Sequence, residues 1–100
     1  MSGTSLDGLD VALCRFTGSG AGSKVDIVQF GTIFYDQSFK EEIRSVFSKR
    51  VVDLEKVCLL NAWIAKQHAE MILQCLEKWN ITPDEIDLVA SHGQTIYHAP

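Results

Sequence analysis

Apolar and polar residues alternate along the first third of the chain, and this pattern predicts two strands. In residues 9–16 (LDVALCRF), apolar side chains occur on both faces, so we expect a strand covered on both sides. Residues 24–36 are rich in β-branched and aromatic side chains and predict a second strand. The glycine- and serine-rich residues 17–23 favour a turn, so the two strands are expected to form an antiparallel hairpin.

The spacing of apolar residues then changes to three and four positions, which predicts two helices. Ser38 and Glu41 have the spacing of a capping box and are expected to begin the first helix. Asp53 is expected to cap a longer helix that runs to about Trp79, with Asn80 in a left-handed conformation behind it. The side chains predicted to face the core are Phe39, Ile43, Val46 and Phe47 in the first helix and Val57, Leu60, Ile64, Met71, Cys75 and Trp79 in the second.

The last part of the chain predicts one helical turn and one strand. Thr82, Pro83 and Glu85 carry the signals of a helix start, but too few residues follow for more than a turn. The apolar residues 86–91 predict a buried parallel strand. The expected order is strand-strand-helix-helix-strand, within one α/β domain that spans residues 1–100. The first loop has no strand before it, and the chain stops just after a strand, at a polar loop of the kind that lines sites, so both ends look cut from a larger protein.

Composition narrows the possible partners and location. The chain is 46% hydrophobic with a formal net charge of −4, which argues against binding to nucleic acid or to an anionic membrane. A phosphate ligand would need local neutralisation by backbone amides or a metal ion. Three scattered cysteines without a signal peptide indicate free thiols in a reducing compartment, and the cytoplasm is the expected location. No apolar run is long enough for a transmembrane helix.

The stretch SGTSLDG, residues 2–8, has two interpretations. It is an ordinary turn, because Asp7-Gly8 is a strong turn signal. It is alternatively a phosphate loop, in which Gly3 admits an anion and Thr4 and Ser5 add hydroxyl donors. It lacks the lysine of a Walker A motif, so Mg²⁺ held by Asp7 or Asp10, directly or through water, would carry the positive charge. Residue types alone favour the turn.

The segment SHGQTIYH, residues 91–98, also has two interpretations. It follows a predicted strand, and open α/β sheets bind ligands at the carboxyl ends of strands. Its polar side chains suit a hydroxyl-rich ligand such as a sugar, although a surface loop explains them equally well. These side chains are His92, Gln94, Thr95, Tyr97 and His98. In the long helix, His68 is expected to be a partly buried histidine with one hydrogen bond, and Cys58 and Cys75 to be packing residues.

Together, MSGTSLDGLDVAL at the start and ASHGQTIYHAP at the end closely resemble the anhydro-N-acetylmuramic acid kinase family. The resemblance covers the whole chain, which looks like the N-terminal part of such a sugar kinase. It implies the ribonuclease H-like sheet of the sugar kinase, Hsp70 and actin superfamily, as a partial N-terminal lobe with the first family strand missing. The implied reaction uses ATP and Mg²⁺ to open the 1,6-anhydro ring and phosphorylate O6. Its product is N-acetylmuramic acid 6-phosphate, in peptidoglycan recycling.

The resemblance also implies roles for particular residues. The ATP phosphates would face the first loop, Gly3, Thr4, Ser5, Leu6, Asp7, Gly8, Leu9 and Asp10, and the amino sugar would face His92, Gln94 and Thr95. The general base, the second phosphate motif and the adenosine pocket belong to later segments of the family. The isolated chain is therefore expected to be inactive, and its open sheet to favour association, a homodimer included. Two alternatives are another amino-sugar kinase and a non-catalytic binding module.

Overall fold

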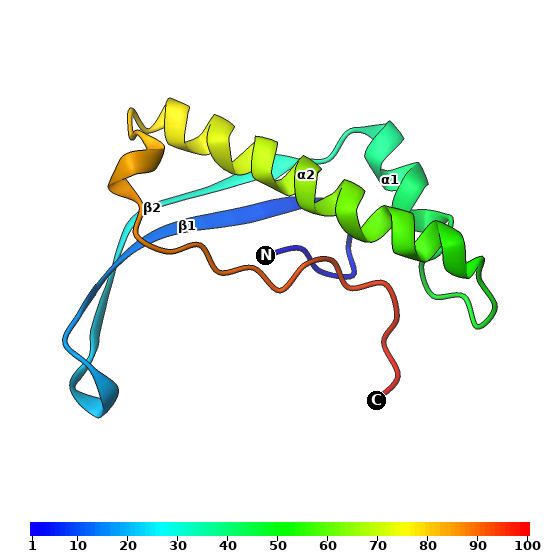
Figure 1. Cartoon of the computed structure of the whole chain (residues 1–100), viewed down its shortest axis with the longest axis horizontal. Coiled ribbons are helices and arrows are strands. Elements are labelled where there is room, and N and C mark those ends of the chain that lie inside the picture. The colour runs from blue at the N-terminus through cyan, green and yellow to red at the C-terminus, as the bar shows by residue number, and fades with distance from the viewer.

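A long two-stranded hairpin forms the sheet of the computed structural model, which describes residues 1–100 (Figure 1). Strands β1 (Gly8–Thr17) and β2 (Lys24–Phe34) are antiparallel, with Gly8 opposite Phe34 and a bulge between Leu13 and Cys14. A short 3-10 turn, η1 (Gly20–Gly22), lies between them. The predicted hairpin is confirmed, with the second strand ending two residues earlier than expected.

Helix α1 (Gln37–Arg44) begins earlier than the sequence predicts. The predicted capping residue, Ser38, is wrong, because the carboxylate of Asp36 accepts the hydrogen bond from the Phe39 N–H at 2.8 Å. Asp36 stands just before the first helical residue with an extended backbone, as a cap requires. The helix therefore begins at Gln37, and Ser38 lies within its first turn.

Helix α2 (Leu54–Lys78) has the bounds that the sequence predicts. The Asp53 carboxylate accepts hydrogen bonds from the N–H groups of Glu55 at 3.0 Å and Lys56 at 3.4 Å. At the other end Asn80 has a φ of 58°, the left-handed conformation expected there. The turn η2 (Pro83–Glu85) follows, and the Glu85 carboxylate accepts from the Thr82 N–H at 2.7 Å. None of these helices has the length and apolar character needed to cross a membrane.

The core lies between the helices and one face of the hairpin (Figure 1). Tyr35 stacks on Phe39 with ring centroids 3.9 Å apart, and Phe39 also stacks on Trp63 with ring centroids 5.2 Å apart. The buried cluster consists of Leu6, Leu9, Tyr35, Phe39, Ile43, Val46, Leu60 and Ile64. Further along α2, Cys75 is buried as predicted, but Cys58 is exposed, so its assignment as a packing residue is wrong.

The expectation that residues 9–16 are covered on both sides is wrong. Leu9 is buried against the helices, whereas Ala12 and Phe16 are exposed. Both helices pack against the same face of the hairpin, so the opposite face has no cover (Figure 1).

The predicted strand over residues 86–91 is also wrong. These residues run as irregular chain after the turn η2 (Figure 1), and Leu88 is 83% exposed. A strand needs a neighbour that pairs with its backbone N–H and C=O groups. None of residues 86–91 pairs with another strand, and the one isolated bridge near them is parallel and joins Ser2 to Gln94. The observed order is therefore strand-strand-helix-helix followed by an extended segment, within a small α/β fold.

Candidate functional site

The loop of residues 2–7 turns sharply before it enters β1. Leu6 adopts a left-handed conformation with a φ of 55° and buries its side chain in the core. The Asp7 carbonyl accepts a hydrogen bond from the Tyr35 N–H at 3.0 Å. At Gly8 a Cβ atom would lie 2.5 Å from the carbonyl oxygen of Ile33, so only glycine fits there. The core and the hairpin thus fix this loop at the end that enters β1.

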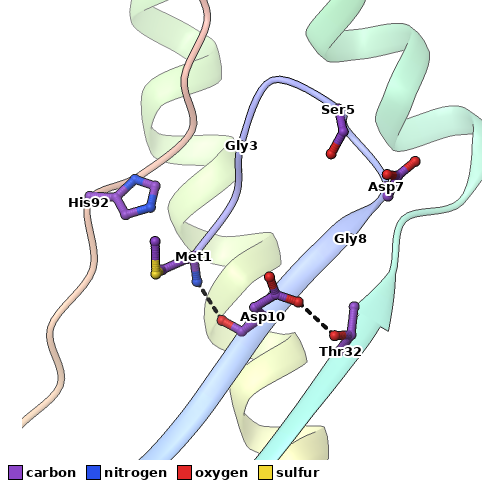
Figure 2. Close-up of a pocket in the computed structure, with 8 residues that line it drawn as sticks. All are labelled: Met1, Gly3, Ser5, Asp7, Gly8, Asp10, Thr32 and His92. Carbon is purple, nitrogen blue, oxygen red and sulfur yellow. Dashed lines mark hydrogen bonds between the residues drawn. The ribbon is translucent and has the colours of Figure 1, made fainter.

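A polar cavity of about 330 Å³ opens between this loop and the C-terminal segment. Figure 2 shows Ser5 and Asp7 on one side of the cavity and His92 across from them. The lining residues are Met1, Gly3, Ser5, Asp7, Gly8, Asp10, Thr32 and His92. Gly3 has open space where a Cβ would stand. Backbone and short oxygen-bearing side chains therefore dominate the wall, a composition that suits a small, highly polar ligand.

Asp10 is oriented by contacts from two directions (Figure 2). The Thr32 hydroxyl, on the opposing strand, donates to the Asp10 carboxylate at 2.6 Å. The backbone N–H of Asp10 donates to the Met1 carbonyl at 2.9 Å, and the terminal amino group of Met1 donates to the Asp10 carbonyl. The sequence interpretation missed Thr32, which only the strand register places opposite Asp10.

The cavity brings together six of the residues predicted to bind ligands: Gly3, Ser5, Asp7, Gly8, Asp10 and His92. Leu6 and Leu9 point into the core, each only 4% exposed, so their side chains face away from it. Thr4 is exposed in the same loop but does not line the cavity. Some side chains of this segment thus anchor it in the core, and others line the cavity.

Neither Gln94 nor Thr95 lines the cavity. The Gln94 amide nitrogen donates to the carbonyl oxygens of Gly3 at 3.0 Å and of Thr95 at 2.9 Å. Its amide oxygen accepts from the hydroxyl of Ser2. Gln94 therefore connects the two predicted loops by direct hydrogen bonds.

A second groove, of about 340 Å³, lies between α2 and the C-terminal segment. It is mainly apolar, with Leu60, Ile64 and Ile72 from the helix facing Val89 and Ile96. His68 and Gln94 are among its few polar lining residues. The sequence interpretation did not predict this groove, because it places residues 86–91 in a sheet rather than along the helix.

His68 is a buried histidine with one side-chain hydrogen bond, as predicted. Its Nε2 atom lies 2.9 Å from the hydroxyl of Tyr35. Burial lowers the pKa of His68, and electrostatic interactions with the terminal amino group and with His92 act in the same direction. Burial also raises the pKa of Tyr35. Both groups are therefore held in their neutral forms near neutral pH.

The oxygen atoms around the first cavity suit a hard cation better than a transition metal. No three histidine, cysteine or acidic side chains come together as a ligand set anywhere in the chain. Asp7 and Asp10 both line the cavity, with the hydroxyls of Ser5 and Thr32 nearby. Mg²⁺ is typically held by one or two carboxylates together with water and substrate phosphates. The donor set therefore fits Mg²⁺ that arrives with a phosphate ligand.

Comparison with known proteins gives one consistent result. The family model described as anhydro-N-acetylmuramic acid kinase matches residues 1–100. Curated proteins of that name are similar over all 100 residues: 59% identical in Pseudoalteromonas atlantica, 50% in Pseudoalteromonas translucida and 42% in Bacillus cereus. The chain covers 25%, 25% and 26% of these relatives, so it spans about a quarter of their length.

Proposed function

Since the chain belongs to the anhydro-N-acetylmuramic acid kinase family, we propose that it supplies the phosphate-holding and sugar-facing part of such a kinase. The observation that carries the proposal is the polar cavity. It joins Gly3, Ser5 and Asp7 of the first loop to His92 of the second, although these residues lie at opposite ends of the sequence. The two motifs, each of which has two interpretations when taken alone, therefore contribute to the wall of one cavity.

The first loop is proposed to hold the phosphates of ATP. Phosphoryl transfer depends mainly on positioning and on neutralisation of charge. The open face of Gly3 lets a phosphate approach the backbone, and Ser5 offers a hydroxyl donor. Because the chain has a net charge of −4, the added negative charge must be neutralised locally. Mg²⁺ held by Asp7 and Asp10, directly or through water, would supply that positive charge.

The second loop is proposed to face the amino sugar. His92 projects from the segment opposite the phosphate loop and offers a ring nitrogen to a sugar hydroxyl (Figure 2). Thr95, beside it and half-buried, and Gln94 are proposed to shape the same side. In the proposed reaction, water adds to the anomeric carbon as the bond from that carbon to O6 breaks. The freed O6 then takes the γ-phosphoryl group, leaving ADP and N-acetylmuramic acid 6-phosphate.

The general base for the attacking water is proposed to come from outside these residues. The Asp10 carboxylate already accepts a hydrogen bond from Thr32, and Asp7 and Asp10 are the proposed Mg²⁺ ligands. Asp87 lies on the exposed part of the C-terminal segment and does not line the cavity. We therefore expect that the 100 residues alone do not catalyse the reaction, consistent with their spanning about a quarter of the relatives' length.

The wider fold and location are proposed on the same basis. The hairpin, the two helices and the parallel bridge between Ser2 and Gln94 are compatible with part of a ribonuclease H-like lobe. Exposed apolar residues of the hairpin, Phe16, Ile27 and Phe30, support association with further sheet or with a second copy. The free thiols of Cys14, Cys58 and Cys75 support a cytoplasmic location.

The test uses the full-length kinase, with phosphorylation of anhydro-N-acetylmuramic acid followed by mass spectrometry. Asp7→Ala is expected to raise the KM for ATP and the Mg²⁺ requirement about tenfold or more, since it removes a charged contact. His92→Ala is expected to raise the KM for the sugar instead. Asp26→Ala, on the exposed part of β2, is the matched control and should change neither.

Two results would contradict the proposal. If Asp7→Ala lowers stability but leaves the kinetics unchanged, residues 2–8 are only a turn. If the wild-type kinase phosphorylates another amino sugar and not this one, the substrate assignment is wrong while the phosphate loop stands.

A further inference from the structure

Four side chains form a continuous row of hydrogen bonds from α2 to the C-terminal segment. Nε2 of His68 lies 2.9 Å from the hydroxyl of Tyr35, which donates to Oγ of Ser2 at 2.6 Å. The Ser2 hydroxyl donates to the amide oxygen of Gln94. Ser2, Tyr35 and His68 are each 5% exposed or less, so water competes little for these bonds. We call these four residues the polar row.

The amide of Gln94 fixes the direction of the polar row. Its nitrogen faces the carbonyl oxygens of Gly3 and Thr95, which only accept hydrogen bonds, so the amide oxygen must face Ser2. Ser2 has one proton and gives it to Gln94, so towards Tyr35 it can only accept. Tyr35 gives its one proton to Ser2 and must therefore accept from Nε2 of His68. Neutral His68 must then carry its proton on Nε2.

From this geometry we propose that Ser2, Tyr35 and His68 are positioning residues that hold Gln94 and thereby fix the two loops relative to each other. Gln94 reaches from the second loop to the Gly3 carbonyl of the first. With its oxygen and its nitrogen both engaged, its amide acts as a tie between the loops. The row thus supports the wall of the cavity without any of its members lining it.

Because the hydrogen bonds of the polar row have a fixed direction, we expect that a substitution at Ser2 changes the tautomer of His68. In Ser2→Ala the Tyr35 hydroxyl loses its acceptor and turns to donate to Nε2 of His68. The imidazole proton then moves from Nε2 to Nδ1, a switch of tautomer at a residue that the substitution does not touch. ¹⁵N NMR of the imidazole in the 100-residue chain at pH 8 distinguishes the two tautomers, since His68 is neutral there.

A second variant tests the other end of the row. Tyr35→Phe keeps the ring stacked on Phe39 but removes the hydroxyl that orders Ser2. Exchange of the Gln94 side-chain amide protons with solvent is expected to accelerate about five- to thirtyfold, the effect of losing one buried hydrogen bond. Tyr97→Phe removes a hydroxyl from a half-exposed ring outside the row and is the matched control, with no change in either signal.

Three results would overturn the proposal: a wild-type His68 protonated on Nδ1, no change of tautomer in a folded Ser2→Ala, or unchanged Gln94 exchange in Tyr35→Phe. If one variant does not fold, the other decides alone.

The consequence for catalysis rests on the proposed function, and there Tyr35→Phe is expected to lower kcat about five- to thirtyfold with little change in the KM for ATP. If His68 switches tautomer in Ser2→Ala but the full-length kinase has no activity, the polar row is supported and the proposed function is refuted. If the full-length kinase is active but His68 does not switch tautomer in Ser2→Ala, the proposed function is supported and the polar row is refuted.

Discussion

The loops of residues 2–7 and 91–95 face the same cavity but are held in place by different kinds of contact. The first is fixed within a short stretch of chain, by burial of Leu6 and by the close packing of Gly8 against β2. The second has one backbone bridge and depends on the side chain of Gln94. The first loop is thus anchored in the core, and the second is tied to the first loop. Substitutions that loosen the first loop should therefore destabilise the whole fold, whereas those that loosen the second should have local effects.

The largest expected effect follows from removing the side chain that anchors the first loop. Leu6→Ala leaves a cavity in the core and is expected to cost about 2–5 kcal/mol of the free energy of unfolding, a large share of the stability of a small domain. Urea denaturation measures the change. Leu59→Ala, at a position of α2 that is 64% exposed, is the control and should stay within about 0.5 kcal/mol. Equal losses in the two variants would mean that Leu6 does not anchor the loop.

A smaller loss is expected from Gly8→Ala, which tests the close approach of the first loop to β2. The added Cβ would meet the Ile33 carbonyl oxygen at 2.5 Å, so the strands must separate, at an expected cost of about 1–3 kcal/mol. At Gly22 nothing lies within 4 Å of an added Cβ, and Gly22→Ala should be neutral or slightly stabilising. Thermal unfolding of the two variants compares them directly, and a stable Gly8→Ala would contradict the described loop packing.

The smallest expected effect concerns acid conditions and the tie between the loops. Because burial lowers the pKa of His68 in the folded chain, the unfolded chain binds a proton first, at its ordinary pKa of about 6.5. The stability from neutral His68 is therefore complete above pH 6.5 and declines as the pH falls through the lowered pKa. Denaturation at pH 7.5 and pH 5 should show less of this decline in His68→Gln than in wild type. His98→Gln, at an exposed position, should retain the decline, and an identical pH dependence in all three proteins would refute the effect.

Much of the fold follows from short-range sequence signals for turns and helix ends. The hairpin, the Asp53 cap and the left-handed Asn80 each depend on residues within a few positions of one another, and all three predictions are confirmed. The predicted cap of α1 is wrong because the extended chain ends at Asp36, whose carboxylate caps the helix, so Ser38 lies within the first helical turn.

Long-range features could not be predicted, since they depend on which segments become neighbours. Residues 86–91 have strand-forming composition, but strand structure requires a pairing partner, and the one bridge of the C-terminal segment lies beyond them, at Gln94. Thr32 joins the site through strand register, and Tyr35 joins it to His68 through packing of a strand end on α2. The turn in the first loop could therefore be predicted from its own residues, whereas the arrangement around the second loop required the structure.

The central claim is that the two loops form one site, with phosphate on the first and sugar against the second. The most direct test is a crystal structure of the full-length kinase with a non-hydrolysable ATP analogue, Mg²⁺ and anhydro-N-acetylmuramic acid. We expect phosphate oxygens within hydrogen-bonding distance of the backbone of Gly3–Asp7, and the sugar in contact with His92. A nucleotide bound away from this loop, or a sugar that does not approach residues 91–95, would contradict it.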